Sequence, residues 1–245
     1  MTPGRPDVAF VASTDLDDTV LTPFYQDILQ PAFPADELIS LDEFRTGYGS
    51  PSPVYHGTLA LRGDEPVGGA LGEYDPGSGL MLLAYLAIRE DQRGTGLGTG
   101  LLNEVLPAWR AALTPTATIA EVEDPRFYRA GPHGDPVARL RFYERLGSTV
   151  LPLPYFQPAL RPDVSRVRGM FLICLDPGRT GVSAAALATF MDEYVGLCEG
   201  PAARDADPEY RAFRDQITAW PDEVPLWPMS AADQVPVTSY AAPLS

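Results

Sequence analysis

The stretch Arg93-Gly94-Thr95-Gly96-Leu97-Gly98-Thr99-Gly100 places a glycine at every second position. It follows the apolar run Leu80–Ile88, which has the composition of a buried strand. Apolar residues then recur at helical spacing over residues 101–109. The order of buried strand, glycine-rich turn and helix is therefore the pattern from which the fold is predicted.

Such a turn is suited to binding a diphosphate. Glycine lets the backbone adopt positive φ and approach a bulky anion closely. The start of the helix adds unpaired N–H groups and a partial positive charge. The spacing differs from the dinucleotide pattern G-x-G-x-x-G, and a chain without lysine has no Walker lysine. The alternative is a β-to-α turn that binds no ligand.

The rest of the chain predicts one mixed α/β domain over residues 1–175 and a helical, proline-rich extension over 176–245. Strands are expected at residues 8–10, 55–62, 66–74, 80–88, 116–123 and 167–175. Helices are expected at 20–29, 33–44, 101–109, 136–146, 184–198 and 208–220. Pro107 should remove one bond of its helix and bend the axis. Residues 221–245 are expected to wrap around the domain or to extend from it.

Composition excludes several function classes. The net charge of −15 disfavours a nucleic-acid partner, and it could attract a cationic acceptor instead. No apolar run is long enough to span a bilayer, and the N-terminus lacks a signal pattern, so we expect a cytoplasmic protein without a membrane partner. The two cysteines and two histidines show no metal-ligand spacing, so no metal is expected.

A second pattern lies at the end of the helix predicted for residues 136–146. It reads Phe142-Tyr143-Glu144-Arg145-Leu146-Gly147. Together with the glycine-rich turn it resembles the GCN5-related N-acetyltransferase (GNAT) superfamily. That family carries Arg/Gln-x-x-Gly-x-Gly/Ala after a buried strand and Phe-Tyr-Glu-x-Leu-Gly at the end of a short helix. The resemblance covers residues 7–175.

The resemblance implies a central mixed, largely antiparallel sheet flanked by helices, and a GNAT-type acyltransferase that uses acetyl-CoA. Backbone groups near Leu86 and Ile88 would pair with the pantetheine arm of the cofactor. The pyrophosphate would bind to the loop that contains Arg93, Gly94, Thr95, Gly96, Gly98 and Thr99. Many relatives have Asn and Ala where this chain has Pro136 and Arg139, and in those relatives the Asn helps to hold the pantetheine arm.

Amine acylation by a thioester requires a neutral nitrogen, and an alkylammonium has a pKa of about 10.4. A base or a water chain must therefore take its proton. Glu123 and Glu121 are the candidate bases, because they share one face of a predicted strand and could also hold a cationic amine. The alternative for them is a solvent face or a salt bridge to Arg126 or Arg129. Tyr143 is the candidate general acid for the departing thiolate, with a core aromatic as the alternative.

His133 is a further candidate base in the loop before the second motif. Glu73 and Tyr85 are others, at the end of one predicted strand and inside the next.

Three functions fit these residues. The first is an N-acetyltransferase that moves an acetyl group from acetyl-CoA to a primary amine of a small molecule, by direct attack in a ternary complex. The second is a protein or peptide amine acetyltransferase, and the third is a non-catalytic acyl-CoA-binding module. The extension could cap the acceptor site or support a homodimer.

Overall fold

The computed structural model describes residues 8–238, and the chain divides into two compact units. The first unit runs to Tyr74 and also takes in Leu83–Thr114. The second unit comprises Asp75–Leu82 and the chain from Pro115 onward. Both units combine helices with antiparallel strands, so the predicted mixed α/β fold with a largely antiparallel sheet is confirmed.

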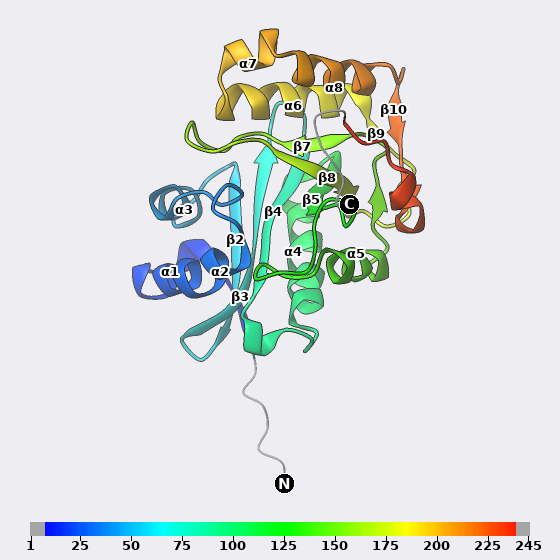
Figure 1. Ribbon diagram of the computed structural model, residues 1–245. Coiled ribbons are helices and arrows are strands. Elements are labelled where there is room, and N and C mark those ends of the chain that lie inside the picture. The colour runs from blue at the N-terminus through cyan, green and yellow to red at the C-terminus, as the bar shows by residue number, and fades with distance from the viewer. Residues whose placement is uncertain (1–7, 239–245) are drawn as a thin grey trace. The chain divides into compact units, whose positions relative to one another are not determined.

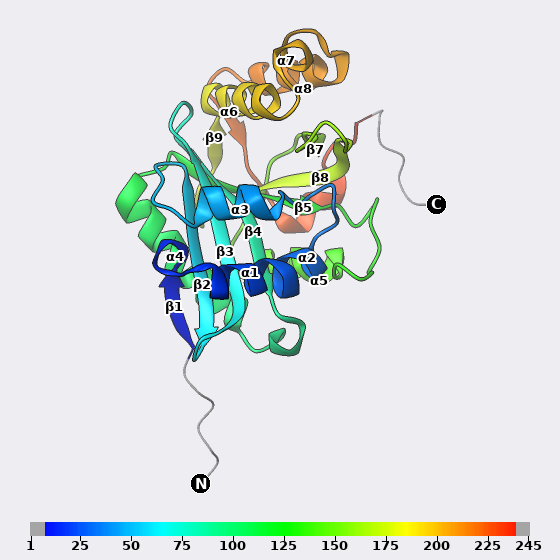
Figure 2. The same ribbon diagram turned by 90° about the vertical axis from the view of Figure 1, so that its left-hand side faces the viewer.

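The sheet of the first unit has the order β1-β2-β3-β4. Its strands are β1 (Ala9–Ala12), β2 (Tyr55–Arg62), β3 (Glu65–Asp75) and β4 (Leu80–Ile88), of which Asp75 and Leu80–Leu82 are counted in the second unit. The β2–β3 hairpin turns at Gly63, whose φ of 62° is the left-handed conformation that glycine adopts without strain. Helices α1 (Asp18–Phe24), α2 (Gln30–Ala32) and α3 (Leu41–Tyr48) cover one face of these strands, as Figure 1 and Figure 2 show. Between α1 and α2, residues Tyr25–Leu29 form a π-helical turn.

An aromatic cluster fills the space between these helices and the strands. Phe24, Phe44 and Tyr48 are fully buried, with ring centroids 5.9 Å apart for the first pair and 5.8 Å for the second. Burying each such side chain stabilises the fold by roughly 1.5–3 kcal/mol. The cluster fixes the position of the strand that leads into the glycine-rich turn, because Tyr85 of β4 belongs to the same buried core.

The helix predicted for residues 33–44 is wrong in its bounds. Phe33 is extended, because the following Pro34 disfavours a helical conformation at the preceding residue. The helix begins only after Ser40, whose hydroxyl accepts a hydrogen bond from the Glu43 amide while the Glu43 carboxylate accepts one from the Ser40 amide. This capping box places α3 at Leu41–Tyr48.

Helix α4 (Leu97–Leu113) follows the glycine-rich turn on the other face of the first unit's sheet (Figure 1). Leu101, Leu102, Val105 and Trp109 form its buried stripe, as the sequence predicted. Pro107 lies inside this helix and is exposed, and the helix continues past it to Leu113.

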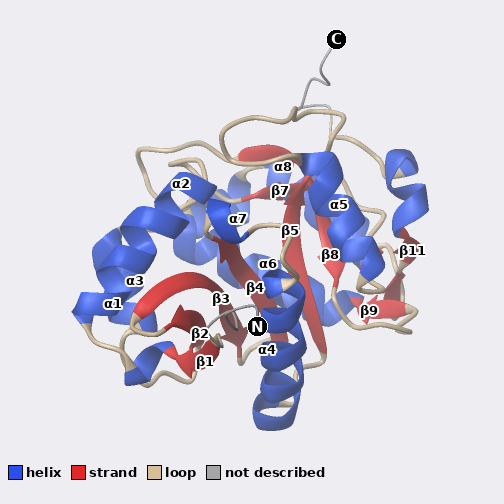
Figure 3. Cartoon of the chain, turned by 90° about the horizontal axis from the view of Figure 1, so that it is seen from below, coloured by secondary structure: helices blue, strands red, loops and turns tan. Residues whose placement is uncertain are grey.

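The second unit is built around strand β8 (Val167–Cys174), which pairs antiparallel with β5 (Ala117–Glu123), β6 (Thr149–Val150) and β7 (Tyr155–Gln157). Helix α5 (Pro136–Arg145) packs against β5, as Figure 3 shows from below. Gly169 forms a bulge in β8 with a φ of 72°, and a side chain there would collide with Phe127.

The C-terminal segment continues within the second unit. It comprises β9 (Gly181–Ser183), α6 (Ala184–Cys198), α7 (Pro201–Ala206), α8 (Pro208–Thr218), β10 (Glu223–Pro225) and β11 (Trp227–Pro228). The helix at 184–198 is confirmed at its predicted bounds. The strand predicted for residues 167–175 is not the last one in the chain. Strands β9 and β10 follow it and pair with each other, and β11 pairs with β6. The last residues of the predicted wrapping segment, 239–245, lie outside the described residues.

Buried ion pairs join α6 and α8 to the segment before β8. The Arg166 side chain is 8% exposed and bonds to carboxylates of Glu199, Asp207 and Glu209. Its guanidinium also lies over the Phe156 ring, 4.7 Å from the centroid. Residues of the C-terminal helices thus contribute to the interior of the second unit.

Candidate functional site

The glycine-rich turn adopts the conformation that its sequence predicts. Gly94 and Gly96 have φ of 73° and 87°, and a Cβ at either position would meet no atom within 4 Å. Gly96 is the N-cap of α4, and no side chain caps the helix. The first backbone hydrogen bond of the helix runs from the Gly100 amide to the Gly96 carbonyl at 2.9 Å. The amides of Leu97, Gly98 and Thr99 precede that bond and have no acceptor within the helix.

Side chains beside the turn hold its backbone in place. Thr95 donates its hydroxyl to the Gln92 carbonyl at 2.7 Å, and Arg93 donates Nε to the Ile88 carbonyl at 3.1 Å. Gln92 is buried and accepts a bond from Arg62 at 2.8 Å. These hydrogen bonds fix the backbone of the turn, while residues 93–96 remain exposed to solvent. An exposed, side-chain-free backbone at a helix N-terminus fits a diphosphate.

The strand that leads into the turn alternates between buried and half-buried residues. Tyr85 and Ala87 are buried, whereas Leu86 and Ile88 are half-buried. The eight residues predicted to hold the cofactor all belong to the first unit. They lie along one continuous path from β4 through the turn into the first turn of α4.

Tyr143 lies on α5 in the second unit and is 6% exposed. Its ring packs edge-on against Phe142, with centroids 5.1 Å apart. Burial raises the pKa of the Tyr143 phenol to about 12, although the positive charge of Arg139 acts to lower it. The phenol therefore carries its proton throughout the physiological pH range and can act only as a proton donor there.

Glu123 ends β5 and is bound by a cation. Arg139 of α5 donates to the Glu123 carboxylate at 2.7 Å, and its other nitrogen donates to the His133 carbonyl at 3.0 Å. The salt bridge that the sequence suggested as an alternative thus forms, but its partner is neither Arg126 nor Arg129. Arg126 pairs instead with Asp124, whose side chain is almost fully buried. Arg139 occupies the position where the family pattern has Ala, and this departure could have indicated the pairing with Glu123.

Glu121 lies two residues earlier on the same face of β5 and is half-buried. It accepts hydrogen bonds from the Tyr155 hydroxyl and, at 2.9 Å, from the side-chain amide of Gln157. The sequence did not indicate Tyr155 or Gln157 as functional residues. They lie on the short strand β7, and a three-residue strand has no periodicity to detect.

The remaining candidates have mainly structural partners. Tyr85 donates its hydroxyl to the Glu37 carbonyl at 3.2 Å, and it accepts a bond from the Ile39 amide at 3.2 Å. Glu73 accepts a bond from the Tyr48 hydroxyl at 3.0 Å. Burial raises the pKa of the Glu73 carboxyl, while this hydrogen bond acts to lower it.

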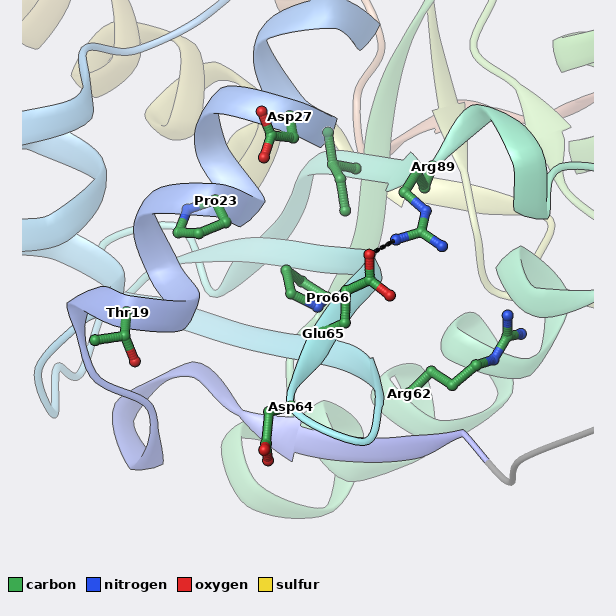
Figure 4. Close-up of a pocket in the computed structure, with 9 residues that line it drawn as sticks. Thr19, Pro23, Asp27, Arg62, Asp64, Glu65, Pro66 and Arg89 are labelled. Carbon is green, nitrogen blue, oxygen red and sulfur yellow. Dashed lines mark hydrogen bonds and ion pairs between the residues drawn. The ribbon is translucent and has the colours of Figure 1, made fainter.

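A pocket of about 570 Å³ opens in the first unit between α1 and the β2–β3 hairpin (Figure 4). Charges of both signs line it, and Arg89 there is bonded to Glu65 and Asp91. None of the residues predicted for the catalytic or cofactor site lines this pocket.

Residues 21–147 match the model of the acetyltransferase (GNAT) family, which spans the glycine-rich turn and the Phe-Tyr-Glu-x-Leu-Gly segment. The chain belongs to the GNAT family. The family expected from the two motifs is thereby confirmed, and this GNAT protein is an acyltransferase that depends on acetyl-CoA.

Solved structures are similar to the GNAT chain in fold. A GNAT-family protein from Bacteroides thetaiotaomicron has a TM-score of 0.51 and 18% identity, and the match covers 87% of this chain and 96% of that one. NAA60 from Arabidopsis thaliana, solved with a bisubstrate analogue, has a TM-score of 0.50 and 14% identity, with 69% and 97% of the two chains covered. The ribosomal-protein-S18-alanine N-acetyltransferase from Escherichia coli has a TM-score of 0.48 and 18% identity, with 71% and 97% covered.

No curated protein matches the GNAT chain in sequence. Within residues 8–238, no helix is both long enough and apolar enough to cross a bilayer.

Proposed function

We propose that this GNAT enzyme transfers the acetyl group of acetyl-CoA to a primary amine of a small molecule, by direct attack in a ternary complex. The observation that carries the proposal is the open, glycine-rich turn at the N-terminus of α4, within a segment that matches the family. Acetyl-CoA supplies an acetyl thioester. The amine nitrogen forms the new C–N bond, the C–S bond breaks, one proton leaves the amine, and one proton is needed by the thiolate.

The backbone around the turn is proposed to hold the cofactor. Amides from Gly94 to Thr99 would bind the diphosphate, because Leu97 to Thr99 form the start of a helix and a Cβ at Gly94 or Gly96 would meet no atom within 4 Å. Leu86 and Ile88 would present backbone groups to the pantetheine arm. Arg93 and Thr95 would contribute chiefly by holding the turn, since their side chains bond to nearby carbonyls.

Tyr143 is proposed to protonate the departing thiolate. We expect Tyr143→Phe to lower kcat by more than about tenfold while leaving the Kd for acetyl-CoA nearly unchanged, because only the proton donor is lost. Steady-state kinetics and a calorimetric titration measure the two quantities. Tyr210→Phe is the control, because it removes another buried hydroxyl, which donates to Asp192 at 2.6 Å. Equal kcat in wild type and Tyr143→Phe would remove this role.

The pH dependence of turnover gives a second test of Tyr143. A group whose pKa is raised to about 12 stays protonated below that pH, so its donor form is retained as the pH rises. We therefore expect the kcat of the wild type to stay constant between about pH 7 and about pH 10, apart from any change that Tyr143→Phe shows as well. A loss with an apparent pKa near the ordinary value of about 10, absent from the variant, would contradict the buried environment.

Glu121 and Glu123 are proposed to serve the acceptor amine, by binding its ammonium form and by accepting its proton. Both lie on one face of β5 in the same unit as Tyr143. The two roles can be separated by Glu121→Gln and Glu123→Gln. Loss of a proton acceptor lowers kcat, whereas loss of an ammonium ligand raises KM for the amine.

A panel of amines tests the function as a whole. Acetyl-CoA is incubated with the enzyme and with small primary amines, with peptides bearing free N-termini, or with lysine peptides, and free thiol is followed. The proposal expects thiol release with small amines. Release with peptides alone would favour the peptide-acetyltransferase alternative, and tight acetyl-CoA binding without release would favour a non-catalytic module. The cytoplasmic location and the homodimer remain predictions from the sequence.

A further inference from the structure

Both strands of the β2–β3 hairpin contact the residues that precede the glycine-rich turn. Arg62, the last residue of β2, and Glu65, the first of β3, are cross-strand partners. Arg62 donates Nη2 to the side-chain oxygen of Gln92 at 2.8 Å. Glu65 accepts a bond from Arg89, whose guanidinium also donates two bonds to Asp91, at 2.7 and 3.1 Å. The hairpin is therefore linked to two consecutive residues before the turn, 91 and 92, through separate side chains.

Gln92 is the residue through which this link reaches the turn. It is 5% exposed, and its side-chain amide donates to Asp91 at 2.7 Å. Its backbone amide donates to the Arg89 carbonyl at 2.8 Å, and its own carbonyl accepts the Thr95 hydroxyl at 2.7 Å. Since Thr95 lies between the two glycines with positive φ, a group that fixes Gln92 also restricts the turn.

Stability alone does not explain these contacts. The Nε of Arg62 is buried with no hydrogen-bond partner in the described part of the chain, and an unpaired buried donor destabilises a fold. Arg89 pairs with Glu65 and Asp91, whose side chains are 65% and 58% exposed, and such exposed pairs stabilise little. Within residues 8–238, Arg62 makes one hydrogen bond and no ion pair, so its contribution is to hold Gln92.

Open space beside the hairpin increases the importance of these polar contacts. Arg62, Glu65 and Arg89 line the pocket of about 570 Å³, and Figure 4 shows the Arg89 guanidinium directed at Glu65. Side chains that line a pocket lack packed neighbours on that side, and segments with few packed neighbours open locally at low free energy. Hydrogen bonds from Arg62 and Arg89 therefore limit how far the turn moves relative to the hairpin.

A glycine-rich turn has more conformational freedom to lose on binding than other turns, and order already present in the free protein raises affinity. We propose that Arg62 is a positioning residue that holds Gln92, and through it the glycine-rich turn, in the conformation that binds the diphosphate of acetyl-CoA. The proposal rests on the proposed function. It adds to the determinants of cofactor affinity a hairpin that contains none of the residues predicted to bind the cofactor. Arg89 acts in the same way through Asp91.

Arg62→Met tests the inference by separating cofactor binding from chemistry. The variant keeps the apolar stem of the side chain and loses the donor to Gln92. We expect the Kd for acetyl-CoA, measured by calorimetry, to rise about tenfold, because the turn is then ordered only on binding. KM for acetyl-CoA should rise in parallel, while kcat at saturating acetyl-CoA stays within about twofold. The thermal midpoint should stay equal or rise, since the buried unpaired Nε is removed as well.

Gln92→Met distinguishes positioning from a direct effect of charge. It removes the oxygen that Arg62 binds and keeps the positive charge of Arg62. Positioning predicts a similar rise in the Kd for acetyl-CoA, and the double variant should bind no more weakly than the weaker single variant, because both changes break one contact. A wild-type Kd in Gln92→Met, beside a raised Kd in Arg62→Met, would mean that the guanidinium attracts the diphosphate directly and would overturn the proposal.

Arg45 of α3 provides the matched control. It is half-buried like Arg62, belongs to the same unit, and donates Nη2 to a neutral oxygen, the Thr22 hydroxyl, at 2.6 Å. Arg45→Met therefore removes an equal charge and a similar contact that involves no residue of the turn. The Kd for acetyl-CoA should stay at the wild-type value. An equal rise in Arg45→Met and Arg62→Met would mean that loss of positive charge weakens binding, and positioning would be refuted.

The order of the turn in the free protein keeps this inference separate from the proposed function. In protein labelled with ¹⁵N at glycine, relaxation of the Gly94 and Gly98 amides reports that order without any ligand. We expect order parameters of about 0.85 in wild type and a fall towards about 0.6 in Arg62→Met. Such a fall, in a protein that binds no acetyl-CoA, would refute the proposed function and support the positioning of the turn by Arg62. Equal order in both proteins, in an enzyme that acetylates amines, would refute that positioning alone.

Discussion

Replacing Gly96 with valine should raise the Kd for acetyl-CoA at least about 100-fold, because the turn would lose two or more amide bonds to a charged diphosphate. Gly96 has a φ of 87°, a conformation that costs a β-branched residue about 1–3 kcal/mol. A Cβ there meets no atom within 4 Å, so the effect arises from the backbone and not from a collision in the core. Isothermal titration calorimetry with acetyl-CoA measures the change.

Gly178→Val is the matched control for that experiment. Gly178 has a φ of 81°, a Cβ there would also meet no atom within 4 Å, and it lies in the turn before β9 in the second unit. The Gly178→Val variant should lose a similar amount of stability and keep its affinity for acetyl-CoA. Normal affinity in Gly96→Val would mean that the turn does not bind the diphosphate. Equal loss in both variants would mean that backbone strain alone was measured.

Arg166→Met should have the largest effect on stability. The substitution leaves Glu199 and Glu209, with side chains 11% and 6% exposed, without the cation that they share. Removing one partner of a buried ion pair costs about 3–5 kcal/mol, because the remaining charge is desolvated and unpaired. Arg168 still pairs with Glu209, so the loss should fall at the lower end of that range. Chemical denaturation followed by circular dichroism measures it.

Arg204→Met tests whether burial is the cause. Arg204 pairs with Asp205, and both side chains are exposed, so its removal should leave the denaturation midpoint nearly unchanged. Similar midpoints for Arg166→Met and wild type would contradict the importance of the buried cluster. If instead only the second unit unfolds early in Arg166→Met, the C-terminal helices stabilise that unit locally.

Local rules explain why the conformation of the glycine-rich turn could be predicted. The bounds of α3 could not be predicted from apolar spacing alone. The glycines at 94 and 96 determine their own conformations, whereas the helix after them begins at Leu97, before the apolar period predicted for residues 101–109. For α3, the apolar spacing suggested an early start, but Pro34 and the Ser40–Glu43 capping box set the start later.

The short strands could not be predicted, because pairing rather than composition creates them. Strands β6, β7 and β11 have two or three residues each and exist through their bonds to β8 or to one another. Tyr155 and Gln157 lie on one of them, and their contacts to Glu121 join residues 34 and 36 positions apart. The domain boundary at residues 175 and 176 stays a prediction, although Arg166 bonds to residues 33–43 positions further along the chain.

The sequence by itself determined the family and the conformation of the glycine-rich turn, because both depend on neighbouring residues whose backbone preferences are intrinsic. Only the tertiary structure decided which groups bind the two carboxylates of β5. Glu121 and Glu123 are equivalent in the strand pattern, yet one accepts bonds from neutral donors and the other binds Arg139. Those partners come from β7 and α5, and the field at a carboxylate depends on which distant groups the fold brings within hydrogen-bond distance.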